Sequence, residues 1–215
     1  MELVAVINRT KYDVFRWRYE LSIPQKIALA FGMAILTGLL AQVRIPLPGN
    51  MVPITGQTFA VLLAGVLLGR WWGGMSMAIY AGLGFAGLPW FTGWASGLGA
   101  TGGYIAGFVL AALFLGHLTD KYVRSRSLFV MLGLMLFANF VLIYVPGLVW
   151  LGLWLRMAQG STVTLVTLIN MGVLPFIIGD VIKAVAAATI ARGVTPKQAY
   201  NGEVDGDKWT SWRIP

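Results

Sequence analysis

The sequence predicts an all-α integral membrane protein whose six transmembrane helices form a bundle, with both termini in the cytoplasm. The first observation is the composition, because 58% of the 215 residues are hydrophobic and 11% are charged, whereas soluble domains carry about 25% charged residues. The second is that the apolar residues form long runs, and one helical span takes roughly 20 residues. The third is that lysine and arginine gather at alternate ends of these runs.

The boundaries of the helices follow from proline, glycine and charge. Pro24 opens the first apolar run, at a position that helices favour, and a polar, proline-rich connection at 44–57 separates this run from the next. Pro146 predicts a kink in the fifth helix. The threonine-rich stretch before the sixth helix is a candidate for extending it upstream. The helices are expected at 24–43, 57–69, 71–88, 102–119, 127–155 and 172–192.

The chain divides into three parts by composition. Residues 1–23 form a basic segment, 24–192 form the six-helix membrane domain, and 193–215 form a polar tail. The first apolar run has no small-residue cleavage site after a short core, so we expect it to be retained as a span rather than removed as a signal peptide. Both flanking segments are expected in the cytoplasm.

The distribution of basic residues supports this topology. The net charge of +8 would suggest a nucleic-acid partner in a soluble protein. Here the basic residues lie at the ends of apolar runs, and cytoplasmic loops are enriched in lysine and arginine, so no nucleic acid is expected. With six spans, the outer side holds Arg44 and Arg156, and Lys183 falls inside a span. The cytoplasmic side holds Arg9, Lys11, Arg16, Arg18, Lys26, Arg70, Lys121, Arg124, Arg126, Arg192, Lys197, Lys208 and Arg213.

The stretch "FIIGDVIKAV" at 176–185 places two opposite charges in an apolar helix. Asp180 is the acidic residue within the predicted spans, and it shares a helix face with Lys183, three positions later. A charged residue at membrane depth costs about 2.5–3.5 kcal/mol on the insertion scale and usually faces a cavity or a partner. The pair is either a neutralised structural pair or a polar binding patch in the outer half of the bundle, and we favour the binding patch.

The first predicted helix carries a row of small residues on one face. Ala30, Ala34 and Gly38 are spaced by four, and such a face lets another helix approach closely in lipid. One interpretation is packing within the bundle. The other, which we favour, is docking to a second membrane protein, and this interpretation requires the face to point to lipid when the chain is alone.

The sequence speaks against an enzyme. It contains no cysteine and one histidine, no phosphate-binding loop ending in GK[ST], and no nucleophile with a recognisable activating base. We therefore predict no catalytic residue, no metal site and no cofactor. Any ATP hydrolysis would have to come from a partner.

Four motifs in order resemble the BioY family, the biotin-specific substrate-binding components, or S components, of energy-coupling-factor transporters. They are "RIPLP…VPITGQTFAVLLAGVLLG" at 44–69, "GLGFAGLPWFTG" at 82–93, "TGGYIAGFVLAALFLG" at 101–116 and "GDVIKA" at 179–184. The resemblance covers nearly the whole chain, from about 24 to 192. Two features depart from the family: Ala100 replaces a proline, and the loop at 92–100 is shorter than typical.

The resemblance implies a six-helix bundle of the S-component type in the cell membrane that takes up biotin. It also implies a transmembrane coupling protein and a pair of cytoplasmic ATPases as partners, with Ala30 and Ala34 resembling the face that meets the coupling protein. The family's ligand-binding aspartate and lysine fall on Asp180 and Lys183. The remaining expected ligand contacts are Arg44, Gln57, Trp90, Thr92 and Tyr104. An S component for another vitamin, or a membrane scaffold or enzyme without transport, remains as an alternative.

Overall fold

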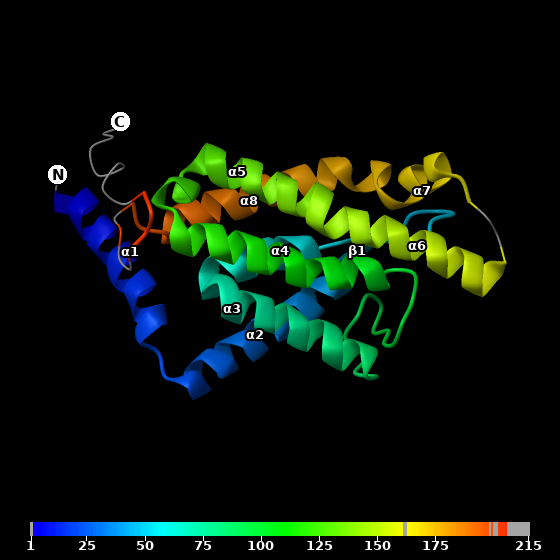
Figure 1. Cartoon of the computed structure of the whole chain (residues 1–215), viewed down its shortest axis with the longest axis horizontal. Helices are drawn as coiled ribbons and strands as arrows, with labels where there is room; N and C mark the ends of the chain where they lie inside the picture. The colour runs from blue at the N-terminus through cyan, green and yellow to red at the C-terminus, as the bar shows by residue number, and fades with distance from the viewer. Residues whose placement is uncertain (1, 161–162, 198, 200–201, 206–215) are drawn as a thin grey trace.

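The computed structural model describes residues 2–160, 163–197, 199 and 202–205. Within these residues the regular secondary structure is helical, apart from one small β-hairpin and an isolated bridge between Phe91 and Ala95 (Figure 1). Lys208 and Arg213, which the topology argument placed in the cytoplasm, lie outside the described residues. The elements are α1 (Glu2–Glu20), α2 (Ile23–Gln42), β1 (Arg44–Ile45), β2 (Ile54–Thr55), α3 (Gln57–Phe85), α4 (Gly102–Lys121), η1 (Val123–Arg126), α5 (Leu128–Phe137), η2 (Ala138–Ile143), α6 (Tyr144–Gln159), α7 (Leu165–Gly172), η3 (Leu174–Phe176) and α8 (Ile177–Val194).

The described residues contain the six expected spans in five long apolar stretches. Two of the spans lie within α3, which Gly69 breaks with φ 80° and ψ 179°, a backbone region that is essentially restricted to glycine. A Cβ on Gly73 would lie 2.7 Å from the carbonyl oxygen of Ala64, so the two halves of α3 run side by side. The stretches are Ile23–Gln42, Gln57–Phe85, Gly102–Lys121, Leu128–Ala158 and Leu165–Val194.

The fifth and sixth spans are each interrupted near a proline. The expected kink at Pro146 takes the form of a π-helical turn, η2, immediately upstream. A proline cannot donate to the carbonyl four residues earlier and its ring crowds that carbonyl, so a wider turn accommodates it. In the sixth span, Pro175 lies within η3, which separates α7 from α8. The threonine-rich stretch does extend this span upstream, because α7 begins at Leu165 with Thr164 as its N-cap.

The N-terminal basic segment forms a helix that the sequence analysis did not expect. Helix α1 lies across the end of the bundle at which α8 ends (Figure 1). Its Phe15 is 4% exposed, and its Arg18 donates to the carbonyl of Val66 at 2.8 Å and pairs with Asp120. Apolar packing and ion pairing therefore attach this segment to the bundle.

Part of the polar tail also packs against this end. Glu203 pairs with Arg126 at 2.6 Å, and the guanidinium of Arg126 lies 4.4 Å from the ring centroid of Phe15. The carboxylate of Asp205 accepts hydrogen bonds from the backbone N–H groups of Val123 and Arg124 at 2.7 and 3.0 Å. Residues 202–205 thus join the α4–α5 connection to α1.

The expectation that the small-residue face of α2 points to lipid is wrong. Ala30 and Ala34 are 0% exposed within the chain itself, and a Cβ on Gly38 would lie 3.3 Å from the Cβ of Trp90. Small side chains allow another backbone to approach α2 closely. Here neighbouring segments of the same bundle make that close approach, as a partner helix would. The side of α2 that is exposed carries Ile27, Phe31 and Ile35.

A candidate ligand-binding site

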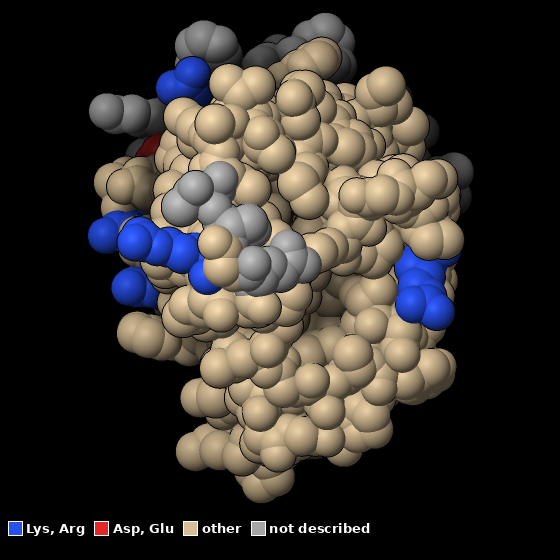
Figure 2. All heavy atoms as spheres, turned by 90° about the vertical axis from the view of Figure 1, so that its right-hand side faces the viewer, with Lys and Arg blue, Asp and Glu red and all other residues tan. Residues whose placement is uncertain are grey.

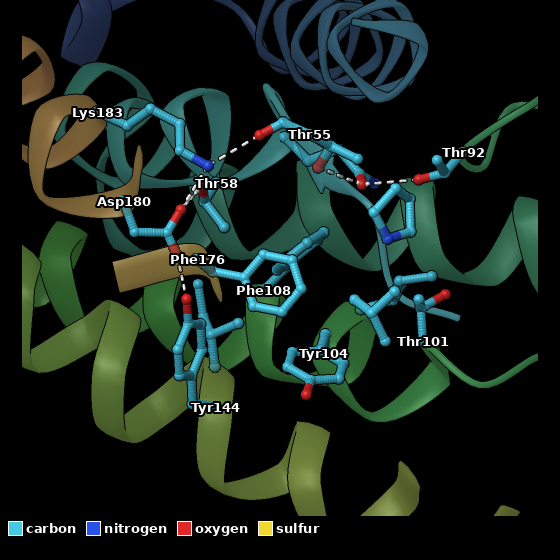
Figure 3. A pocket seen from close by; sticks show the side chains of 15 residues that line it. Thr55, Thr58, Thr92, Thr101, Tyr104, Phe108, Tyr144, Phe176, Asp180 and Lys183 are labelled. Atoms are coloured by element: carbon cyan, nitrogen blue, oxygen red, sulfur yellow. Dashed lines mark hydrogen bonds and ion pairs between the residues drawn. The ribbon is translucent and has the colours of Figure 1, made fainter. Parts of the chain in front are cut away.

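A small cavity of about 60 Å³ lies between the β-hairpin, α3, α4, α6 and α8 (Figure 3). The hairpin pairs Arg44 with Thr55 and Ile45 with Ile54, and Val52, Pro53 and Thr55 of this segment line the cavity. The lining combines hydroxyl groups, one ion pair and aromatic rings. Its residues are Val52, Pro53, Thr55, Gln57, Thr58, Thr92, Thr101, Tyr104, Ile105, Phe108, Ile143, Tyr144, Phe176, Asp180 and Lys183.

Asp180 is the most heavily hydrogen-bonded group of the cavity. It is 3% exposed and lies in the first turn of α8, where the helix dipole favours a negative charge. Its Oδ1 accepts from the hydroxyl of Thr58 at 3.1 Å and pairs with Lys183. Its Oδ2 accepts from the amide of Asn139 at 2.8 Å and from the hydroxyl of Tyr144. These contacts offset the cost of burying the charge.

Lys183 connects α8 to the β-hairpin. Its ammonium group pairs with Asp180 and donates to the carbonyl oxygen of Thr55 at 2.8 Å. An ammonium has three N–H donors, and the structure gives two acceptors for this one within the described residues. The side chain keeps 18% of its surface exposed, so one donor remains for a ligand.

The π-helical turn explains why Asn139 and Tyr144 reach the same oxygen. Residues five positions apart on an α-helix point in directions that differ by about 140°, since each residue turns about 100°. The wider turn of η2, Ala138–Ile143, reduces this angle, so both side chains face Asp180. Such π-turns often occur at functional sites. The sequence analysis missed both residues, and the available signal was a single amide in the otherwise apolar run "MLFANFVLIYV".

Gln57 and Thr92 lie together at the hairpin side of the cavity. The amide oxygen of Gln57 accepts from the hydroxyls of Thr55 at 3.0 Å and Thr92 at 3.1 Å. Its amide nitrogen donates to the hydroxyl of Tyr80 at 2.7 Å. Gln57 therefore links the hairpin, the loop that contains Thr92 and both halves of α3.

The remaining predicted contacts are divided by the fold. The ring of Tyr104 lines the cavity, while its hydroxyl donates to the carbonyl of Gly172 at 3.0 Å. Trp90 instead belongs to the core, with its indole N–H donating to the carbonyl of Tyr80 at 2.9 Å. Arg44 is exposed on β1, and its guanidinium lies against Gly93, outside the cavity lining.

Most of the ligand contacts predicted from the sequence therefore lie around the same cavity. Gln57, Thr92, Tyr104, Asp180 and Lys183 line one cavity, whereas Arg44 and Trp90 do not. Apolar side chains that the sequence analysis did not predict add walls to the cavity, and these are Val52, Pro53, Ile105, Phe108, Ile143 and Phe176. Their apolar character gave no signal, because it does not distinguish a cavity wall from the core or from a lipid-facing surface.

The family model described as the BioY family matches residues 11–199. The chain belongs to the BioY family. A protein of Methanothermobacter thermautotrophicus called "Probable biotin transporter BioY" is 52% identical over 157 residues, covering 71% of this chain and all of that protein. The "Biotin transporter BioY" of Thermotoga maritima is 34% identical over 151 residues, covering 68% of this chain and 83% of that protein.

A solved structure extends the similarity to three dimensions. A crystal structure described as the S-component for biotin from an ECF-type ABC transporter matches with a TM-score of 0.68 and 28% identity. The match covers 80% of this chain and 93% of that one. Together with the apolar spans and the family membership, the comparison identifies a multi-pass protein of the cell membrane with the S-component fold.

Proposed function

We propose that this chain binds biotin and acts as the substrate-binding component of an energy-coupling-factor transporter. The observation that carries the proposal is the Asp180–Lys183 ion pair on the wall of a cavity. The names of the relatives, biotin transporters in different organisms, support the choice of ligand. A buried charged pair that only stabilised the fold would not require a cavity beside it.

The chemistry of the pair suits the ureido ring of biotin. That ring carries two N–H donors and one carbonyl acceptor. The carboxylate of Asp180 can accept from an N–H, and the remaining N–H of Lys183 can donate to the carbonyl. The thioether ring and the valeryl chain are apolar, and apolar walls with few polar groups are typical of small-molecule sites. The rings of Tyr104, Phe108 and Phe176 provide such walls.

Biotin entry requires the cavity to open. Its volume of about 60 Å³ is far below the roughly 300–1,000 Å³ of ligand sites. The hairpin is held against the cavity by two polar links at Thr55, whose carbonyl accepts from Lys183 at 2.8 Å and whose hydroxyl donates to Gln57 at 3.0 Å. We propose that these links yield when biotin enters, and that Arg44, on the outer strand of the hairpin, receives the valeryl carboxylate at the mouth.

We infer the orientation of the chain from the distribution of its basic residues. Lysine and arginine gather at the end of the bundle that α1 covers, in α1 itself, in the last turn of α4 and in η1. The opposite end, shown in Figure 2, presents mainly uncharged residues, with lysine and arginine towards its edges. By the positive-inside rule we assign the α1 end to the cytoplasm. The transmembrane coupling protein and the ATPase pair are proposed partners.

Binding of radiolabelled biotin to the purified protein tests the function. Saturable binding that excess unlabelled biotin competes away, and that excess thiamine or riboflavin leaves unchanged, is the expected result. Competition by another vitamin would instead support an S component of different specificity. No saturable binding of any vitamin would overturn the proposal in favour of a scaffold or an enzyme.

A further inference from the structure

Asp180 has little hydrogen-bonding capacity left for a ligand. An ionised carboxylate offers about four lone-pair positions, and within the described residues it receives four donors. Oδ1 receives Thr58 and Lys183, while Oδ2 receives Asn139 and Tyr144. A ligand N–H can therefore reach this carboxylate only when one donor leaves.

The two donors on Oδ2 are fixed in the interior. Asn139 is 1% exposed and Tyr144 is 4% exposed, and the π-helical turn holds both on the same side of Asp180. Asn139 does not line the cavity, and Tyr144, which does line it, meets the carboxylate from the side opposite Thr58 and Lys183 (Figure 3). Departure of Asn139 would leave a buried amide without an acceptor, which is unfavourable.

The two donors on Oδ1 face the cavity but differ in charge. Thr58 and Lys183 both line it, and Figure 3 shows them on the same side of the Asp180 carboxylate. Removal of Lys183 from the pair would leave a buried carboxylate without its counter-charge, which is strongly unfavourable. Removal of a neutral hydroxyl bond at 3.1 Å costs far less. Thr58 is therefore the donor that a ligand can replace.

We propose that the Thr58 hydroxyl is a placeholder that Asp180 exchanges for an N–H of the ligand, while Asn139 and Tyr144 are positioning residues that hold the other carboxylate oxygen. The identity of the ligand rests on the proposed function. The recognised group is a cyclic urea or amide in which an N–H adjoins a carbonyl, because Lys183 has one donor left for that carbonyl beside Oδ1.

The proposal predicts opposite effects for donors to the same carboxylate. In a Thr58→Val variant the unliganded protein loses the hydroxyl bond and the complex loses nothing, so biotin affinity stays within threefold of the parent or rises. In Tyr144→Phe and Asn139→Leu the carboxylate is no longer held in place, and biotin affinity falls tenfold or more. Thr58→Ser, which keeps the hydroxyl, is the matched control and should equal the parent.

Titration calorimetry of the purified full-length variants with biotin and with its two mono-N-methyl ureido derivatives makes the test. One derivative lacks the N–H that meets Asp180, so the parent should bind it much more weakly than the other. Tyr144→Phe and Asn139→Leu should bind this derivative about as well as the parent binds it. The derivative cannot form the hydrogen bond to Asp180 that these substitutions weaken. A variant that is merely misfolded would lose affinity for all three ligands alike.

Each of the following outcomes would overturn the inference. A tenfold or larger loss in Thr58→Val, with Thr58→Ser unchanged, would mean that the hydroxyl remains in the complex. Equal losses for biotin and both methylated forms would remove the positioning role of Asn139 and Tyr144. Absence of biotin binding by the parent would overturn the proposed function and the exchange together. If the parent binds biotin but Thr58→Val loses more affinity than Tyr144→Phe and Asn139→Leu, the exchange alone is overturned.

Discussion

The guanidinium of Arg126 and the carboxylate of Glu203 form a 2.6 Å ion pair whose side chains are 1% and 0% exposed. The pair links the α4–α5 connection to the chain segment beyond α8, at the end covered by α1. Removal of one partner from a buried pair typically costs about 3–5 kcal/mol, because the other charge is left uncompensated. The segment beyond the last span therefore contributes to the stability of the bundle.

We expect Glu203→Gln to lower the thermal stability of the detergent-purified protein substantially, by about 3–5 kcal/mol of unfolding free energy. The measurement is the unfolding midpoint in a fixed detergent. Glu20→Gln is the control, because Glu20 forms an ion pair with Arg16 in which both side chains are about half exposed, and such pairs contribute about 0–1 kcal/mol. Equal midpoints for the two variants would contradict a structural role for Glu203.

For the binding site, we expect Asp180→Asn and Lys183→Met each to reduce biotin affinity by roughly tenfold or more, because a hydrogen bond to a charged group is worth about 1.5–3 kcal/mol. Both proteins should still insert into the membrane and purify. The measurement is equilibrium binding of labelled biotin, with Glu20→Gln again as the charge-neutralised control. Affinity equal to that of the parent in either variant would make the pair purely structural.

For α2, we expect Ala30→Leu combined with Ala34→Leu to destabilise the protein and to impair biotin binding as well as uptake. Both positions are fully buried within the chain, and overpacking costs typically about 1–3 kcal/mol per site. Ile35→Leu, on the exposed side of the same helix, is the control. Intact binding with lost uptake would instead restore the docking interpretation of this face.

The turn inside α3 yields a backbone prediction. Gly69 has φ 80° and ψ 179°, so Gly69→Ala should cost about 1–3 kcal/mol from strain. The added Cβ would also lie 2.8 Å from a carboxylate oxygen of Asp120. Gly32→Ala in α2 is the matched control, since a Cβ there meets nothing within 4 Å and alanine favours a helix. Unfolding midpoints of the two variants should move in opposite directions.

The membrane orientation can be tested with single cysteines, because the chain has none of its own. We expect Met51→Cys, 42% exposed beside the hairpin, to react with an impermeant maleimide in intact cells. Lys197→Cys, exposed beyond the end of α8, should react only after the membrane is opened. The reverse labelling pattern would overturn the assignment of the α1 end to the cytoplasm.

The sequence alone was sufficient for the features that depend on composition and on local spacing. Long apolar runs predict membrane spans, because a helix satisfies its own backbone in lipid. The spacing of Asp180 and Lys183 places them on one helix face, and four ordered motifs identify the family. None of these inferences requires knowledge of which surfaces meet.

Only the tertiary structure decided what each helix face contacts. A stripe such as Ala30 and Ala34 satisfies the packing requirement equally well against a partner or against its own bundle, so the sequence did not distinguish them. Asn139 and Tyr144 reach Asp180 because a π-helical turn changes their relative direction, and their spacing alone would place them apart. The site therefore depends on long-range packing, which local sequence patterns do not encode.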